Sequence, residues 1–103
     1  MTAIGFTNRS SAATPSKSAE ENNRIGDDYY YGRNGKPQDY KEAVRLYRLA
    51  ADQGNAVAQY NLGICYEFGK GVAKDLDEAI RLYRLAAEQG HENAKKALRR
   101  LGR

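Results

Sequence analysis

Residues 42–58, EAVRLYRLAADQGNAVA, occur again as residues 78–94, EAIRLYRLAAEQGHENA, with 12 of 17 positions identical at an offset of 36 residues. Within each copy, apolar residues recur at the i, i+3, i+4, i+7 spacing of one buried helical face. These residues are Ala43, Leu46, Tyr47 and Ala50 in the first copy and Ala79, Leu82, Tyr83 and Ala86 in the second. Charged side chains occupy the opposite face. Each copy therefore predicts an amphipathic helix.

The segment before each copy is repeated as well. Gly26 matches Gly63 at an offset of 37 residues, and one extra loop residue near Asn34 accounts for the difference in offset. A period in the thirties with two elements per unit indicates stacked helical hairpins. We expect an all-α solenoid of about two and a half helix-turn-helix repeats.

Capping residues predict where these helices begin and end. The segments Ser18-Ala-Glu-Glu21, Asp39-Tyr-Lys-Glu42 and Asp75-Leu-Asp-Glu78 have the capping-box form, and Gly54 and Gly90 supply the left-handed residue that ends a helix. The first helix of each unit is expected at about 19–31 and, after Asn55 as N-cap, at 55–68. The resulting organisation is a flexible tail at 1–17 and a repeat domain at 18–102, divided into repeat 1 (18–54), repeat 2 (55–90) and a C-terminal capping helix (91–102).

Gly63 lies inside a predicted helix, where glycine costs about 1 kcal/mol relative to alanine. Its recurrence at Gly26 suggests that a neighbouring helix crosses there too closely for a side chain. In the last helix Arg99 takes the place of this glycine, so no following helix needs to approach it.

The net charge of +4 lies entirely in the last 13 residues, which hold five cations against Glu92 alone. A basic helix of this kind could bind nucleic acid or another anionic surface, and a solvated end helix is the simpler interpretation. The chain has no apolar run near the roughly 20 residues of a membrane span and no apparent secretory signal. We expect a soluble, cytoplasmic protein, with secretion without a cleavable signal as the alternative.

Catalytic and metal sites find little support. Cys65 is the only cysteine and lies on an apolar stripe, which indicates a buried, inert thiol. His91, the only histidine, stands at a helix start and is expected to be a cap. Gly69-Lys70-Gly71 lacks the features of a phosphate-binding loop and is interpreted as a turn. We expect no enzyme activity, no cofactor and no metal.

The spaced residues of repeat 2 form a pattern that resembles the Sel-one-like repeat family, a branch of the tetratricopeptide-like α-solenoids. The pattern is carried by Leu62, Gly63, Tyr66, Gly69, Gly71, Val72, Asp75, Glu78, Ala79, Tyr83, Ala86, Ala87, Gln89 and Gly90. The resemblance implies a right-handed superhelix whose first helices line a concave face that holds protein partners in adaptors and scaffolds. Cysteine-rich members linked to β-lactam binding are disfavoured as relatives, because Cys65 has no cysteine partner.

With that architecture, helix geometry selects the side chains that would line the concave groove. They are Glu20, Asn23, Asp27 and Tyr30 from the first helix, Tyr60, Ile64 and Glu67 from the third, and Asn93, Lys96 and Arg100 from the last. The groove would run from acidic through apolar to basic, with Tyr60 and Ile64 as the anchor for a peptide or partner helix. The alternative is that Tyr60 only covers the neighbouring helix. Weak self-association through the end helices is also expected.

Overall fold

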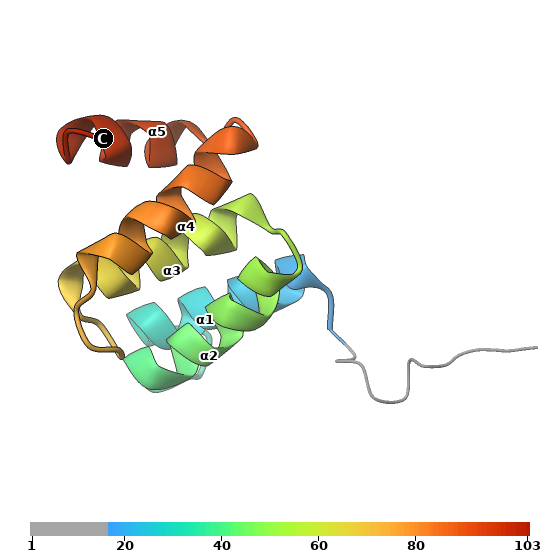
Figure 1. The fold of residues 1–103 in the computed structure, drawn as a ribbon. Helices are drawn as coiled ribbons and strands as arrows, with labels where there is room; N and C mark the ends of the chain where they lie inside the picture. Colours follow the sequence, from blue (N-terminus) through green and yellow to red (C-terminus); the bar gives the residue numbers. More distant parts are fainter. Residues whose placement is uncertain (1–16) are drawn as a thin grey trace, which may run out of the picture.

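The computed structural model describes residues 17–103, so the expected tail lies almost wholly outside the described residues. The described part is all-helical, without strands, as predicted (Figure 1). Its helices are α1 (Ala19–Tyr31), α2 (Tyr40–Asp52), α3 (Ala56–Phe68), α4 (Leu76–Glu88) and α5 (Glu92–Arg100). The first four match the predicted ranges. The last helix is shorter than expected, because Leu101 is its C-cap and Gly102 turns the chain at φ +74°.

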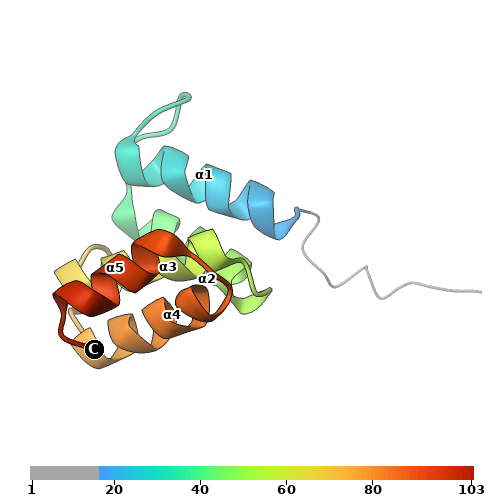
Figure 2. The same cartoon turned by 90° about the horizontal axis from the view of Figure 1, so that it is seen from above.

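The helices form two hairpins and a final helix stacked in chain order (Figure 1). The hairpin α1–α2 lies at one end of the stack, α3–α4 follows, and α5 packs on α4 at the other end. Seen from above, α1 and α4 lie on opposite sides of the stack (Figure 2). This arrangement is the predicted solenoid.

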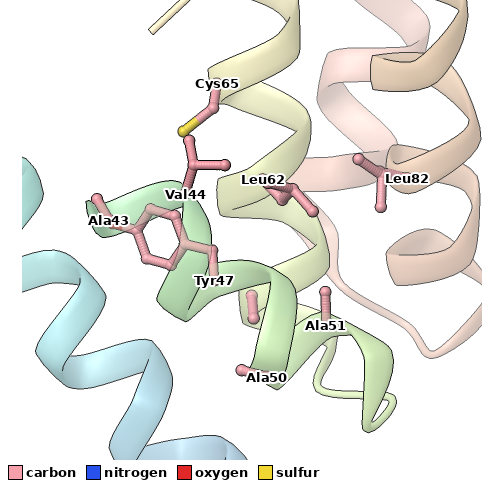
Figure 3. Packing of buried hydrophobic residues seen from close by; sticks show 9 residues of the cluster. Ala43, Val44, Tyr47, Ala50, Ala51, Leu62, Cys65 and Leu82 are labelled. Atoms are coloured by element: carbon pink, nitrogen blue, oxygen red, sulfur yellow. The ribbon is translucent and has the colours of Figure 1, made fainter. Parts of the chain in front are cut away.

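The core joins each hairpin to the next. All eight stripe residues predicted from the repeat are at most 5% exposed. The α2 stripe packs against Ala58, Leu62 and Cys65 of α3, and Figure 3 shows the Cys65 sulfur close to Val44. The α4 stripe packs in the same way against Ala94 and Ala97 of α5. Each second helix therefore buries its apolar face against the first helix of the following unit.

The glycine inside each first helix makes room for a tyrosine of the paired second helix. A Cβ at Gly63 would lie 2.7 Å from Tyr83 Cε1, and one at Gly26 would lie 2.8 Å from the Tyr47 ring. The predicted close crossing is confirmed, and its cause is a buried ring. Arg99 occupies this position in α5, so α5 has no space for a further tyrosine.

The helix starts confirm one complete capping box and correct two others. The Ser18 side chain accepts from the Glu21 N–H, and the Glu21 carboxylate accepts from the Ser18 N–H. Asp39 accepts from the Glu42 N–H at 3.1 Å, but the return bond is missing because the Asp39 N–H already donates to the Tyr29 carbonyl at 2.8 Å. The Glu42 carboxylate binds Arg45 instead. Repeat 2 has the same arrangement at Asp75, so the capping-box prediction was wrong for both second helices.

Candidate functional site

A pocket of about 150 Å³ opens where the two units meet. It is lined by Tyr30 and Tyr31 of α1, Tyr47 of α2, and Tyr60, Asn61 and Ile64 of α3, and we call it the tyrosine pocket. Ligand sites for whole small molecules usually enclose at least about 300 Å³. The tyrosine pocket is therefore of a size for one side chain of a partner.

The pocket brings together three of the residues predicted for the groove and adds three that sequence reasoning missed. Tyr30, Tyr60 and Ile64 were predicted, whereas Tyr31, Tyr47 and Asn61 were not. The Tyr30 and Tyr31 rings meet edge to face with centroids 4.8 Å apart. Burial is the main cause that raises the pKa of Tyr30 above 10.0, so its hydroxyl stays neutral at physiological pH.

Tyr60 both lines the pocket and covers a neighbouring helix. Its ring centroid lies 4.8 Å from that of His91 and 5.7 Å from that of Tyr83. The two interpretations of Tyr60 are thus compatible, because packing against α4 and the start of α5 holds the ring in place at the pocket wall.

Asp27 contacts two of the residues that line the pocket, Tyr47 and Asn61. Its Oδ1 atom accepts from the Tyr47 hydroxyl at 2.6 Å and lies 3.5 Å from the amide nitrogen of Asn61. Asn61 donates to Asn23 of α1 at 3.0 Å. These contacts join α1 to α3, and we call the surface formed by α1, α3 and α5 the first-helix face.

Glu67 and Arg100, two further predicted groove residues, bind each other. The Glu67 side chain is 7% exposed and accepts two bonds from the Arg100 guanidinium, at 2.7 and 2.9 Å. The Tyr83 hydroxyl donates to the same carboxylate at 2.6 Å. The hydrogen bonds from Arg100, followed by that from Tyr83, hold the pKa of Glu67 below 4.5 against the opposing effect of burial. The Glu67 carboxylate is therefore engaged inside the protein.

This lowered pKa predicts a loss of stability in acid. A carboxylate whose pKa is lower in the folded state stabilises the fold above its ordinary value of 4.5, and that stabilisation is lost as the pH falls through the folded-state pKa. We expect the free energy of unfolding of the wild type to fall more steeply below pH 4.5 than that of Glu67→Gln. Urea unfolding at several pH values measures both slopes, and parallel slopes would contradict the assignment.

The remaining predicted groove residues lie at the two ends of the first-helix face. Glu20 is exposed near the start of α1, and Asn93 and Lys96 are exposed on α5. Ion pairing reduces the basic surface of α5, because Lys95 pairs with Glu92 at 3.3 Å and Arg100 with Glu67.

A larger cleft of about 550 Å³, which was not predicted, lies at the outer side of the first hairpin. Its lining includes Ile25 and Asp28 of α1 and Leu46 of α2. Nearby, the Asn22 amide nitrogen is buried without a hydrogen-bond partner in the described part of the chain. Its counterpart in α3, Gln59, donates to the Ala51 carbonyl of the preceding second helix at 3.3 Å. Among residues 17–103, α1 thus has an unpartnered donor at the position where α3 contacts the preceding second helix.

The single cysteine and histidine have the structural roles predicted for them. Cys65 is fully buried, and burial raises the pKa of its thiol to about 12. His91 caps α5, since its Nδ1 atom accepts from the Ala94 N–H at 3.1 Å. Residues 17–103 contain no group of three or more His, Cys, Asp or Glu side chains arranged to hold a metal ion. Among the helices described, none has the length and apolar character needed to cross a membrane.

Comparison with curated proteins finds relatives far longer than this chain. Over 48 residues the chain is 48% identical to the ERAD-associated E3 ubiquitin-protein ligase component HRD3B of Arabidopsis thaliana, which covers 47% of this chain and 8% of that protein. It is 46% identical over 52 residues to protein sel-1 homolog 2 of Mus musculus, covering 50% of this chain and 7% of that protein. The chain thus spans less than a tenth of either relative.

Solved structures and a family profile agree on the repeat. A Sel1 repeat protein from Oxalobacter formigenes superposes with a TM-score of 0.78 at 41% identity, covering 84% of this chain and 35% of that one. The protective antigen c5321 of uropathogenic Escherichia coli, which displays an SLR fold, superposes with a TM-score of 0.75 at 40% identity, covering 78% and 17%. The Sel1 repeat profile matches residues 22–55 and 56–91, more than half of the chain. This chain belongs to the Sel1 repeat family.

Proposed function

We propose that this chain is an adaptor that binds a peptide or helix of a partner protein on its first-helix face, with the tyrosine pocket as the anchor site. Sel1 repeat proteins are generally protein-interaction modules. The observation that carries the proposal is the pocket itself, in which four tyrosines and Ile64 from both units surround a space of about 150 Å³. Tyrosine-rich pockets that exclude water are where binding energy concentrates in interfaces.

The flanking polar residues would give the partner its direction. Glu20, Asn23 and Asp27 lie on the α1 side of the pocket, and Asn93 and Lys96 lie on α5. A partner that crosses the first-helix face would therefore meet acidic groups at one end and Lys96 at the other. Arg100 would contribute less than predicted, because Glu67 holds its guanidinium. Cytoplasmic location, weak self-association and binding of anions by α5 stay predictions from the sequence.

The proposal predicts that Tyr60→Ala with Ile64→Ala abolishes partner capture. Truncating a central anchor typically costs 2 kcal/mol or more, which is about a 30-fold loss of affinity. The measurement is quantitative mass spectrometry of proteins captured by tagged wild type and by the double variant. Phe68→Ala is the matched control, since Phe68 is an α3 aromatic residue that is 55% exposed and does not line the pocket. Identical capture by the double variant and the wild type would contradict the proposal.

A further inference from the structure

We infer that the partner side chain received by the tyrosine pocket is an arginine, whose guanidinium group binds Asp27 and stacks on the tyrosine rings. This inference rests on the proposed function and specifies its ligand. Its basis is a comparison of the two repeats: in both, the tyrosine of the second helix donates to a carboxylate of the first helix, and in repeat 2 that carboxylate also binds an arginine.

In repeat 2 a carboxylate, a tyrosine hydroxyl and a guanidinium form one cluster. Glu67 accepts from the Tyr83 hydroxyl at 2.6 Å and from Arg100 at 2.7 and 2.9 Å. The arginine comes from α5, the first helix of the following unit. Bidentate hydrogen bonds between a guanidinium and a carboxylate are among the strongest that side chains make.

In repeat 1 the carboxylate and the tyrosine are present, but the cation is missing. Asp27 accepts from the Tyr47 hydroxyl at 2.6 Å, the same distance as in repeat 2. Asp27 lies one helical turn before Tyr30, the residue that corresponds to Glu67, and the α3 residue next to it is Asn61, which carries no charge. Asp27 forms no ion pair with any residue in the range 17–103, and its one further contact is the neutral amide of Asn61 at 3.5 Å.

The Asp27 carboxylate adjoins the tyrosine pocket without being one of the residues that line it. Both side chains that contact Asp27 Oδ1, those of Tyr47 and Asn61, line the tyrosine pocket. An apolar partner side chain would take water away from this carboxylate and offer no hydrogen bond in return, which is unfavourable. A cationic partner side chain would supply the missing charge.

The aromatic walls favour arginine over lysine. A guanidinium is planar, stacks on tyrosine rings and donates several hydrogen bonds in a fixed geometry, whereas an ammonium group is a compact and strongly hydrated charge. Cations of both kinds lie over tyrosine rings in residues 17–103, since Arg33 lies 4.8 Å from the centre of the Tyr31 ring and Lys70 lies 5.2 Å from that of Tyr40. The pocket thus offers tyrosine rings to the group that Asp27, in contact with two of the lining residues, would bind.

The test uses four pools of fluorescent heptapeptides with random flanking residues and a fixed central arginine, citrulline, lysine or leucine. Citrulline has nearly the shape of arginine without its charge, so this comparison leaves the protein unchanged. We expect the arginine pool to bind the wild-type chain about tenfold more tightly than the citrulline pool. Tighter binding of the lysine pool, or equal binding of arginine and citrulline, would overturn the inference.

Asp27→Asn provides the matching change in the protein. Asparagine keeps an oxygen that accepts from Tyr47, so the fold is preserved while the charge is removed. We expect about a tenfold loss for the arginine pool and no change for the citrulline pool. Asp77→Asn is the control, because Asp77 is an exposed carboxylate on α4. Unchanged arginine binding by Asp27→Asn would overturn the inference.

The outcomes separate this inference from the proposed function. If the leucine pool binds best and Tyr60→Ala removes that binding, the first-helix face is a docking site but its ligand is apolar, and the arginine inference is wrong. If the wild type binds none of the four pools, both the inference and the proposed anchor site are wrong.

Discussion

Gly71→Ala is expected to destabilise the fold by about 3 kcal/mol, from left-handed backbone strain of about 1 kcal/mol and a steric clash of about 2 kcal/mol. Gly71 has φ +75°, and a Cβ there would lie 2.5 Å from the Tyr40 carbonyl oxygen. That oxygen belongs to the backbone at the start of α2, so the contact cannot be relieved by turning a side chain. The loop between α3 and α4 is thus held directly against the first hairpin.

Gly35 is the matched control for Gly71, because it stands 36 residues earlier in the corresponding loop. Its φ is +79°, but a Cβ there would have no neighbour within 4 Å. Gly35→Ala should therefore cost only the strain of about 1 kcal/mol. Urea unfolding of both variants measures the difference. Equal losses of stability would mean that the loop does not contact Tyr40 in solution.

Tyr83→Ala is expected to lower the free energy of unfolding by about 4 kcal/mol. The Tyr83 side chain is fully buried, packs against Gly63 and donates to Glu67. Tyr83→Phe removes only the hydroxyl and leaves Glu67 with Arg100, so it should cost about 1 to 2 kcal/mol. Comparison of the two variants by urea unfolding separates the ring from its hydrogen bond. A phenylalanine variant as unstable as the alanine variant would contradict this division.

Gly63→Ala should destabilise the fold when residue 83 is tyrosine and stabilise it when residue 83 is alanine. In the wild type, Gly63→Ala places Cβ 2.7 Å from the Tyr83 ring, and overpacking of this kind costs about 1 to 3 kcal/mol. With Tyr83→Ala the obstacle is gone, and the higher helix propensity of alanine should stabilise the fold by about 1 kcal/mol. A double-mutant cycle measures this coupling. Additive effects would show that the two side chains do not compete for one space.

Local signals explain why the helices could be predicted from the sequence. Helix spacing, the N-cap residues and the two intrahelical glycines depend on residues a few positions apart or on the repeat itself, and these features were confirmed. The missing half of the capping box at Asp39 was not predictable in the same way. It depends on the Tyr29 carbonyl, which reaches Asp39 only after the hairpin has formed.

The candidate site was predicted less completely because it lies between units. Helix geometry assigned Glu67 and Arg100 to the same face, but their pairing depends on the distance between α3 and α5. The sequence indicated this ion pair only in part, because Glu67 and Arg100 carry opposite charges at neighbouring places in the predicted groove. Tyr31 and Asn61 enter the pocket through the packing of α1 against α3, which no spacing within one helix encodes.

The buried amide of Asn22 and the arginine at position 99 give this array a polarity that matters for protein engineering. A hairpin grafted upstream of α1 would bring a carbonyl to Asn22 and complete its bonding, as Ala51 does for Gln59. A hairpin grafted downstream would drive an aromatic ring into Arg99 unless that residue were first returned to glycine. Repeats can thus be added before α1 without further change, whereas adding them after α5 first requires Arg99→Gly.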